Sequence, residues 1–471
     1  MTQPLYEWTA KQLLAAYKNG TLSPVEATRS VLDRITECEP HVHATWLSDA
    51  NDALAQAIAS ERRWTRGQPA GPLDGVPVTL KENIATRGAP VPLGSAATPL
   101  IPAAADAPAA ARLRESGAVM VAKTTMPDFG LLGAAASSFH PLSRNPWDTR
   151  LNTGGSSSGA GAAAAAGYGP LHLGTDIGGS VRIPASFCGV FGFKPSQGRV
   201  PTVPPAAARV IGPLTRTVDD AARLMSVVSS PDHRDYTSLP PQNISWLNLE
   251  RSVKGLRIGL WLEPAADWQV DSQIRQAIQE AARVFERAGA LVEPVNDWTT
   301  ADMYLGIAHF FSMRCRIELQ DMPPERAALA AGYVRDAAAF AGSLSADDVF
   351  RSFASMQAMQ AATVHATQPY DYLLAPTSPV LPFAAEAINS GSEAPVKDAH
   401  FTIVFNQSGQ PAASIPCGYS ADGMPIGLQI AGRRHDDLGV LQMARFYESE
   451  SSSLRLSPAR KPPLVANPAG F

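Results

Sequence analysis

The chain has 471 residues, of which 45% are hydrophobic and 17% are charged, and its formal net charge is −4. This hydrophobic content excludes an intrinsically disordered chain, and the length allows one large domain or up to three smaller ones. The nearly balanced charge, without any run of Lys and Arg, argues against binding to nucleic acid.

Helices are expected at the start of the chain. One is expected over Thr9–Lys18, and a second over Ala27–Cys38 follows the sequence Ser23–Glu26, which has the pattern of a helix-capping box with proline in the first turn. We therefore expect residues 1–70 to form a helical layer that packs on a main unit formed by residues 71–471.

Strand and helix signals alternate in the next part of the chain. Short apolar strand segments broken by Gly and Pro occupy Leu73–Leu80, and a helix over Ala107–Glu115 precedes a buried strand over Ala118–Ala122. Farther along, Thr217–Asp220 is expected to cap a helix that continues through Val227.

The clearest pattern lies after residue 250. A strand over Leu256–Trp261, an amphipathic helix over Asp271–Ala288 and a strand over Ala290–Val295 form a βαβ-like unit, which predicts a sheet that is at least partly parallel. The polar, proline-bearing segment Pro231–Asn248 is interpreted as a surface connection. Together these elements favour one large α/β body.

The stretch Asn152–Gly167 is uncharged and rich in Gly, Ser and Ala, and it predicts a tight loop that runs into a helix N-terminus. Several interpretations compete. Gly155–Gly159 matches a nucleophile elbow with Ser157 as nucleophile, although the preceding segment is a poor apolar strand. Gly159–Ala164 fits a dinucleotide fingerprint but lacks the same strand, and no Gly-Lys-Ser/Thr follows to make a phosphate loop. A flexible Gly/Ser linker is the simplest alternative.

Two further segments favour catalysis. In Gly174–Ala185, paired glycines precede Ser180 and would let several backbone N–H groups converge beside its hydroxyl, as an oxyanion hole requires. In Gly75–Asn83, an apolar strand ends at Lys81, where burial would lower the pKa of the amine and let it act as a base near neutral pH.

These three segments together resemble the amidase signature family of serine hydrolases. The resemblance covers most of the chain, from the helix at Thr9 to Asn406–Pro416 and Gly423–Ile430, and the intervals between its lysine and its two serines match the family's Ser-Ser-Lys triad. It implies an α/β fold with a large mixed β-sheet covered by helices on both faces, and it implies hydrolysis of an amide bond through an acyl-enzyme intermediate.

The resemblance also implies roles for individual residues. Ser180 would be the nucleophile, Ser156 the bridging serine next to a cis peptide bond, and Lys81 the base. The remaining assignments are an oxyanion hole formed by the N–H groups of Ile177, Gly178, Gly179 and Ser180, support from Ser157, Asp176 and Arg182, and substrate contacts from Met126, Phe129, Gly130 and Leu131.

Other residue patterns argue against a metal, a cofactor, a membrane or secretion. The nine histidines have no metal-ligand spacing; His41 and His43 are expected in a loop, and His172 just before a turn at Gly174. The uncharged stretch Leu151–Thr175 lacks the bulky apolar residues of a membrane span, and Met1–Lys18 lacks a signal-peptide pattern, so a cytoplasmic protein is expected. Buried free thiols are expected for the four widely spaced cysteines, Cys38, Cys188, Cys315 and Cys417.

The substrate is predicted from two segments that line the acyl pocket in this family. Here Met126–Ala136 and Met303–Phe311 are largely apolar, which favours a neutral apolar or aryl amide, and the same tetrahedral chemistry serves esters and carbamates (urethanes). Arg314 and Arg316 are the cations to consider for a charged substrate. The alternatives are a glutaminase-type subunit of a tRNA-dependent amidotransferase and a non-catalytic binding protein of the same fold; a homodimer is a further family-level expectation.

Overall fold

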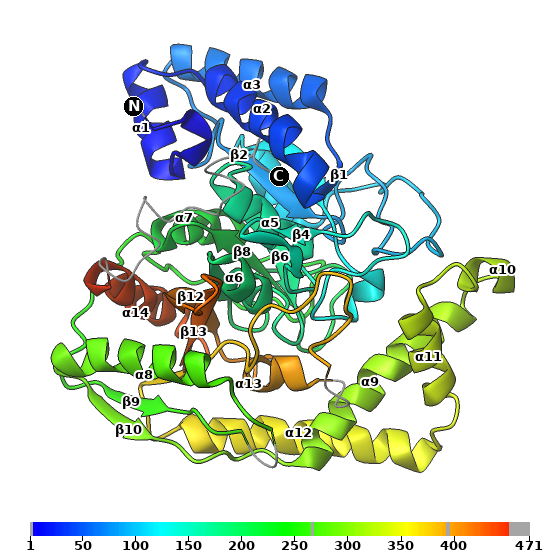
Figure 1. The fold of residues 1–471 in the computed structure, drawn as a ribbon. Coiled ribbons are helices and arrows are strands. Elements are labelled where there is room, and N and C mark those ends of the chain that lie inside the picture. The colour runs from blue at the N-terminus through cyan, green and yellow to red at the C-terminus, as the bar shows by residue number, and fades with distance from the viewer. Residues whose placement is uncertain (1–2, 265–267, 392–395, 452–471) are drawn as a thin grey trace.

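The fold is built around one large mixed β-sheet (Figure 1). The computed structural model describes residues 3–264, 268–391 and 396–451. Within them, eleven strands lie in the spatial order β1 (Thr45–Leu47), β3 (Val119–Thr124), β2 (Pro77–Lys81), β6 (Leu171–Asp176), β8 (Val210–Thr215), β7 (Phe191–Lys194), β12 (Ala412–Tyr419), β13 (Pro425–Gly432), β11 (Tyr372–Pro376), β9 (Arg257–Leu260) and β10 (Leu291–Pro294).

The sheet combines two parallel parts with an antiparallel centre. Strand β2 pairs in parallel with β3 and β6, and β9 pairs in parallel with β10 and β11. The central strands from β6 to β11 pair antiparallel, and β1 is antiparallel to β3. Every residue of β2 and β6 is buried, as expected for strands that are covered on both faces. The predicted mixed α/β sheet is therefore confirmed.

The predicted N-terminal helices are confirmed. Helix α1 (Ala10–Asn19) begins at the capping box of Thr9 and ends at the left-handed Gly20. Helix α2 (Pro24–Val42) begins at the capping box of Ser23, and α3 (Ala50–Thr65) packs against α2 and β3. The division of the chain at residue 70 stays a prediction.

Two short helices cover one face of the sheet. Helix α5 (Ser158–Ala166) and helix α6 (Arg182–Cys188) pack on each other, and all residues of both are buried. A Cβ at Gly159 would meet the backbone of Ala44 and Thr125, and one at Gly161 would meet Pro184. The small residues of this stretch are thus required by close packing, and the interpretation as a flexible linker is wrong.

Helices α4 (Pro108–Glu115), α7 (Val218–Val228), α8 (Ser272–Arg287) and α14 (Asp437–Glu450) lie on the other face, with side chains in the largest apolar cluster. Thr217 caps α7, and β9, α8 and β10 form the predicted βαβ unit with parallel strands. The segment 231–248 has no helix or strand, as expected for a connection.

A group of helices extends to one side of the sheet, drawn in yellow-green and yellow in Figure 1. It consists of α9 (Ala301–Gln320), α10 (Pro324–Ala327), α11 (Gly332–Ala341) and α12 (Ala346–Thr367), and α9 packs against both α11 and α12. Helix α13 (His400–Gln407) lies between α12 and the sheet (Figure 1).

Two local expectations were wrong. Helix α2 continues through Pro40 to Val42, so His41 lies in its last turn instead of a loop. Gly174 lies inside β6, and His172 in the same strand is within hydrogen-bond distance of Thr79. All four cysteines are free and buried, as predicted. Among the described residues, no helix is long and apolar enough to cross a membrane.

Candidate active site

Lys81 lies at the last position of β2, fully buried, and its amine meets three hydroxyl groups. The Nζ atom is 2.8 Å from Ser156 Oγ, 3.1 Å from Ser157 Oγ and 3.0 Å from Thr175 Oγ1. Burial lowers the pKa of Lys81 to about 7, because the charged form has lost its water. At neutral pH a large share of this lysine is therefore a neutral amine that can accept a proton.

Two other lysines are equally buried, and burial lowers the pKa of each to about 7. Lys123 donates to Ile84 O and Thr86 Oγ1, and Lys194 donates to Pro195 O. In the described part of the chain, neither lysine is hydrogen-bonded to a serine hydroxyl. Geometry, and not the pKa, therefore distinguishes Lys81 as the candidate base.

Ser156 and Ser157 lie in the loop that leads into α5, and their environments differ. The peptide bond between Gly155 and Ser156 is cis. The hydroxyl of Ser157 donates to Thr175 O and accepts from Thr175 N–H and from Lys81. Ser157 therefore has no proton left for Lys81. No other described group accepts the proton of Ser156, so this proton can be donated to Lys81.

This arrangement argues against Ser157 as the nucleophile of an elbow. The strand before the loop, β5 (Asp148–Asn152), pairs with β4 (Arg144–Asn145) in a separate two-stranded sheet and forms one isolated bridge from Leu151 to Ala384, so it is not a strand of the main sheet. The side chain of Ser157 is fully buried and saturated with hydrogen bonds. The lack of an apolar strand pattern before Gly155 in the sequence is consistent with this arrangement.

Ser180 lies in the loop between β6 and α6. Its side chain borders a cavity, and within the described part of the chain its hydroxyl has no hydrogen-bond partner. Its carbonyl oxygen accepts from Ser157 N–H at 3.1 Å, which ties this loop to the one that carries Ser156. No hydrogen bond joins the hydroxyls of Ser180 and Ser156 in these described loops, which is common for catalytic contacts before a substrate is bound.

The backbone N–H groups around Ser180 differ from the expected set of four. Gly179 N–H donates to Asp176 Oδ1 at 2.7 Å, so it is not free to bind an oxyanion. The N–H groups of Ile177, Gly178 and Ser180 have no partner among the described residues, and all three residues line the cavity. The candidate oxyanion hole is therefore formed by three groups.

A buried ion pair between Asp176 and Arg182 stabilises the loop that carries Ser180. Arg182 Nε and Nη2 each lie 3.0 Å from a carboxylate oxygen of Asp176, and both side chains are fully buried. Burial alone would raise the pKa of Asp176, but the adjacent Arg182 holds that pKa below its ordinary value. The same carboxylate also accepts the N–H of Val181. The expected supporting residues Asp176, Arg182 and Ser157 thus all contact the catalytic loops.

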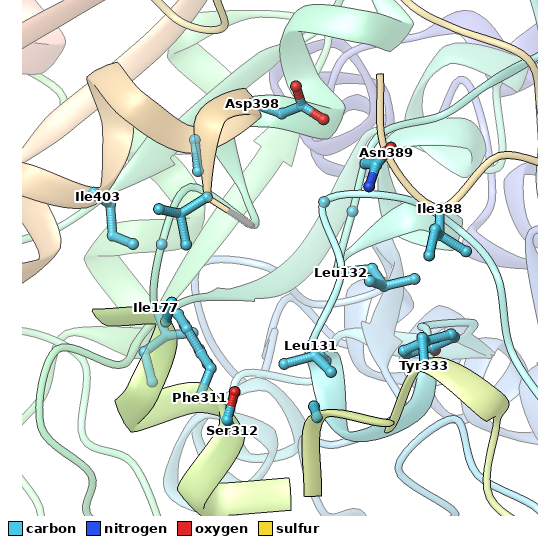
Figure 2. A pocket seen from close by; sticks show the side chains of 18 of the residues that line it. Leu131, Leu132, Ile177, Phe311, Ser312, Tyr333, Ile388, Asn389, Asp398 and Ile403 are labelled. Atoms are coloured by element: carbon cyan, nitrogen blue, oxygen red, sulfur yellow. The ribbon is translucent and has the colours of Figure 1, made fainter. Parts of the chain in front are cut away.

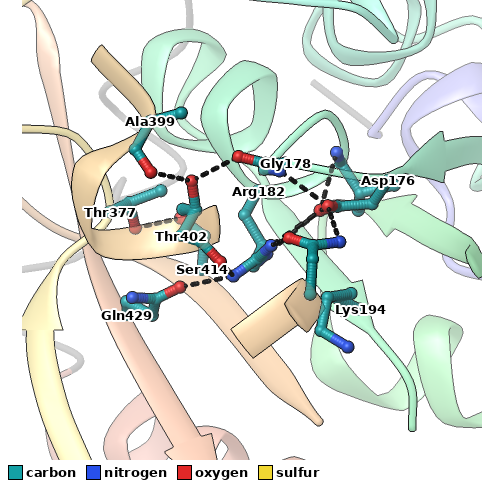
Figure 3. Close-up of polar contacts among 12 residues, drawn as sticks. Asp176, Gly178, Arg182, Lys194, Thr377, Ala399, Thr402, Ser414 and Gln429 are labelled. Carbon is teal, nitrogen blue, oxygen red and sulfur yellow. Dashed lines mark hydrogen bonds and ion pairs between the residues drawn. The ribbon is translucent and has the colours of Figure 1, made fainter. Parts of the chain in front are cut away.

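Helix α13 adds polar contacts to this pair (Figure 3). Asn406 Nδ2 donates to Asp176 Oδ1 and its Oδ1 accepts from Arg182, while Thr402 Oγ1 lies 2.7 Å from Gly178 O. Neither residue was predicted as functional. The available signal was a pair of polar residues at positions i and i+4 in the helix His400–Gln407, whose residues between them are apolar.

The cavity above Ser180 has a volume of about 470 Å³ and a mostly apolar wall (Figure 2). Gly130 and Leu131 lie in the wall as expected, whereas Met126 and Phe129 are absent from it and are buried. The loop that carries them is anchored to α11, because Tyr333 Oη accepts from Asp128 N–H and donates to Ala136 O. The larger aliphatic and phenyl side chains around the cavity belong to Leu131, Leu132, Ile177, Ile183, Leu305, Phe311, Phe340, Ile388, Val396 and Ile403.

Most of this wall was not predicted from the sequence. Part of the expected Met303–Phe311 segment lines it, but the contributions of α11, of residues 388–389 and of residues 396–403 were not foreseen. Arg314 and Arg316 are not in the wall, and the guanidinium of Arg314 lies 5.9 Å from the ring centre of Phe311. The described wall contains two carboxylates, Asp336 and Asp398, and neither Lys nor Arg.

Comparisons with known proteins agree with this geometry. The amidase family model matches residues 26–441. A glutamyl-tRNA(Gln) amidotransferase subunit from Myxococcus xanthus is 35% identical, covering 96% of this chain and 99% of the relative, and an acylamidase from Rhodococcus erythropolis is 32% identical, covering 95% and 97%. The crystal structure of a bacterial aryl acylamidase of the amidase signature family superposes with a TM-score of 0.90 at 28% identity over the full length of both chains.

The chain therefore belongs to the amidase signature family. It is an amidase, a hydrolase of carbon–nitrogen bonds in amides. In the described part of the chain, no group of three or more His, Cys, Asp and Glu side chains could hold a metal ion.

Proposed function

We propose that the protein hydrolyses neutral apolar or aryl amides through an acyl-enzyme intermediate on Ser180. The observation that carries this proposal is the position of Lys81, a buried amine with a lowered pKa, at 2.8 Å from Ser156 Oγ and next to the loop of Ser180. A neutral amine in this place can draw a proton from one serine while that serine draws a proton from the next.

The reaction begins when Ser180 Oγ attacks the amide carbonyl. Its proton moves to Ser156, and the proton of Ser156 moves to Lys81. The oxyanion that forms is stabilised by the N–H groups of Ile177, Gly178 and Ser180, each contributing about 3 kcal/mol. Collapse of the tetrahedral intermediate returns a proton to the leaving nitrogen and leaves an ester on Ser180. Water then attacks this ester by the same proton path and releases the acid.

The apolar wall favours a hydrophobic acyl or aryl group. A cavity of about 470 Å³ is within the usual range for small-molecule sites. Burial of an apolar group against its leucine, isoleucine and phenylalanine side chains lowers the free energy of the complex. Because an ester or a carbamate forms the same kind of oxyanion, these compounds are expected as additional substrates.

A glutaminase-type subunit of an amidotransferase is the second candidate, since the Myxococcus relative is named a glutamyl-tRNA(Gln) amidotransferase subunit. Glutamine carries a carboxylate, and the described wall offers it no Lys or Arg. A stand-alone amidase is therefore favoured. The non-catalytic alternative is disfavoured because Lys81, Ser156 and Ser180 are all present.

The substrate class is tested with a matched set of amides assayed on the isolated chain. Acetanilide, benzamide, hexanamide, glutamine and succinamic acid differ in apolar area and charge, and the S180A variant serves as the inactive control. We expect kcat/KM to be at least about tenfold higher for the neutral apolar amides than for the two carboxylates, because a buried apolar group contributes about 1.5–3 kcal/mol. A preference for glutamine, or activity in S180A, would contradict the proposal.

A further inference from the structure

The peptide unit between Gly178 and Gly179 is fixed at both of its polar ends. Its carbonyl oxygen lies 2.7 Å from Thr402 Oγ1, and its N–H donates to Asp176 Oδ1 at 2.7 Å. Figure 3 shows the hydroxyl of Thr402 directed at this carbonyl, with Ala399 O as its second neighbour at 3.0 Å. The peptide therefore has one defined orientation.

This orientation matters because the neighbouring peptide groups carry the candidate oxyanion donors. Two successive glycines impose almost no side-chain restraint on the backbone, and Gly179 has a φ of 126°. If the peptide turned over, the carbonyl oxygen of Gly178 would face the cavity that Gly178 lines. A carbonyl oxygen at that place would repel the developing oxyanion instead of stabilising it.

Thr402 is itself held rigidly. Its side chain is fully buried, and its backbone carbonyl accepts from Arg182 Nη1 at 2.9 Å. A Cβ at Gly179 would collide with the Thr402 hydroxyl, so the two residues are in close contact. Because water does not reach this contact, no solvent molecule can replace the hydroxyl if it is removed.

We propose that Thr402 is a positioning residue of the oxyanion hole, which acts by keeping the Gly178 carbonyl turned away from the oxyanion. The proposal rests on the proposed role of Ser180 as nucleophile. It predicts that the loss of the Thr402 hydroxyl weakens binding of the transition state more than binding of the substrate.

The test compares kcat and KM in purified variants with a neutral aryl amide. T402V removes the hydroxyl but keeps the shape, and T402S keeps the hydroxyl. T377V is the matched control, because Thr377 is also fully buried and donates to Ser414 Oγ, away from the cavity wall (Figure 3). We expect T402V to lower kcat by about 10- to 100-fold with KM nearly unchanged, since one oxyanion donor is typically worth about 10²–10³ in kcat. T402S and T377V should keep kcat within about twofold of the wild type, a much smaller change than the loss of kcat expected when an oxyanion donor is disturbed.

Thermal unfolding of each variant separates positioning from general destabilisation. If T402V kept the wild-type kcat, or if T377V lost as much kcat as T402V, the proposal would be wrong. If T402V does not fold, T402S and T402A replace it, because these two differ only by the hydroxyl; equal kcat values would overturn the proposal. Activity in S180A would instead contradict the proposed function, so the two failures are distinguishable.

Discussion

At the scale of single residues, the account depends on the protonation state of Lys81. Burial lowers its pKa to about 7, and only the neutral amine can accept a proton from Ser156. The protonated, inactive form therefore dominates below that pKa. This gives a direct prediction for the pH dependence of activity.

We expect kcat/KM to rise with pH through about 7 and then to level off. K81M should remain folded, since it removes a costly buried amine, and should lose about 10²–10⁴-fold in kcat/KM. K123M is the control, because Lys123 has a similar pKa but does not contact a serine. If K123M removed the rise near pH 7, or K81M kept it, Lys81 would not be the base.

The candidate catalytic residues could be identified from the sequence, but the detailed geometry around them could not. The family motifs led to Lys81, Ser156 and Ser180, and the structure places the first two in contact. They did not reveal that Gly179 N–H is bonded to Asp176, because this depends on how the loop bends back on its own carboxylate. The expectation that Met126 and Phe129 contact the substrate has a similar limit. A motif identifies a loop, but it does not show which side chains of that loop face the cavity.

Among the helices and strands, features set by neighbouring residues were predicted well from the sequence, whereas the pairing of distant strands was not predicted. The caps at Thr9 and Ser23 involve residues three positions apart, so the sequence contains all that is needed to find them. The antiparallel pairing of β6 with β8, by contrast, was not foreseen, since it joins segments that no local pattern relates. The same holds for α13, which reaches the catalytic loops only through the tertiary fold.

The contact between α1 and α7 supplies a prediction at this scale. Asp220 on α7 is fully buried, its Oδ1 accepts from Ala10 N–H at the start of α1, and its Oδ2 has no partner among the described residues. Burial raises the pKa of Asp220 to about 7, although the neighbouring Arg216 lowers it and Asp219 raises it further. Because this pKa is raised on folding, its contribution to stability is fully present below the ordinary pKa of 3.8, declines as the pH rises above that value, and is lost once the pH has passed about 7.

The variant D220N keeps an oxygen acceptor for Ala10 N–H and stays neutral at every pH. We therefore expect D220N to unfold at a higher temperature than the wild type at pH 8, and we expect this difference to shrink steadily as the pH falls toward the ordinary pKa of 3.8, measured by calorimetry. D219N is the control, since Asp219 is partly exposed and pairs with Arg223. A difference in melting temperature that did not change with pH would contradict this account of Asp220.

At the scale of the whole molecule, the sheet brings distant parts of the chain to one place. Lys81 comes from the end of β2, Ser156 from the loop before α5 and Ser180 from the loop after β6. The wall of the cavity combines these loops and the loop of Leu131 with helices and loops that follow residue 300. The parallel pairing of β2 with β6 places their carboxyl ends side by side, which is where open α/β sheets bind ligands. The uncharged, glycine-rich composition of residues 151–175 therefore serves close packing around the site and helps to keep Lys81 neutral.

If Ser180 is the nucleophile, it carries the acyl group of the intermediate, which the mass of the intact protein reveals. After rapid acid quenching of a reaction with a p-nitrophenyl ester of a hydrophobic acid, we expect one added acyl group per chain, located by peptide mapping on Ser180 and missing in S180A. An acyl group on Ser157, or undiminished turnover by S180A, would contradict it.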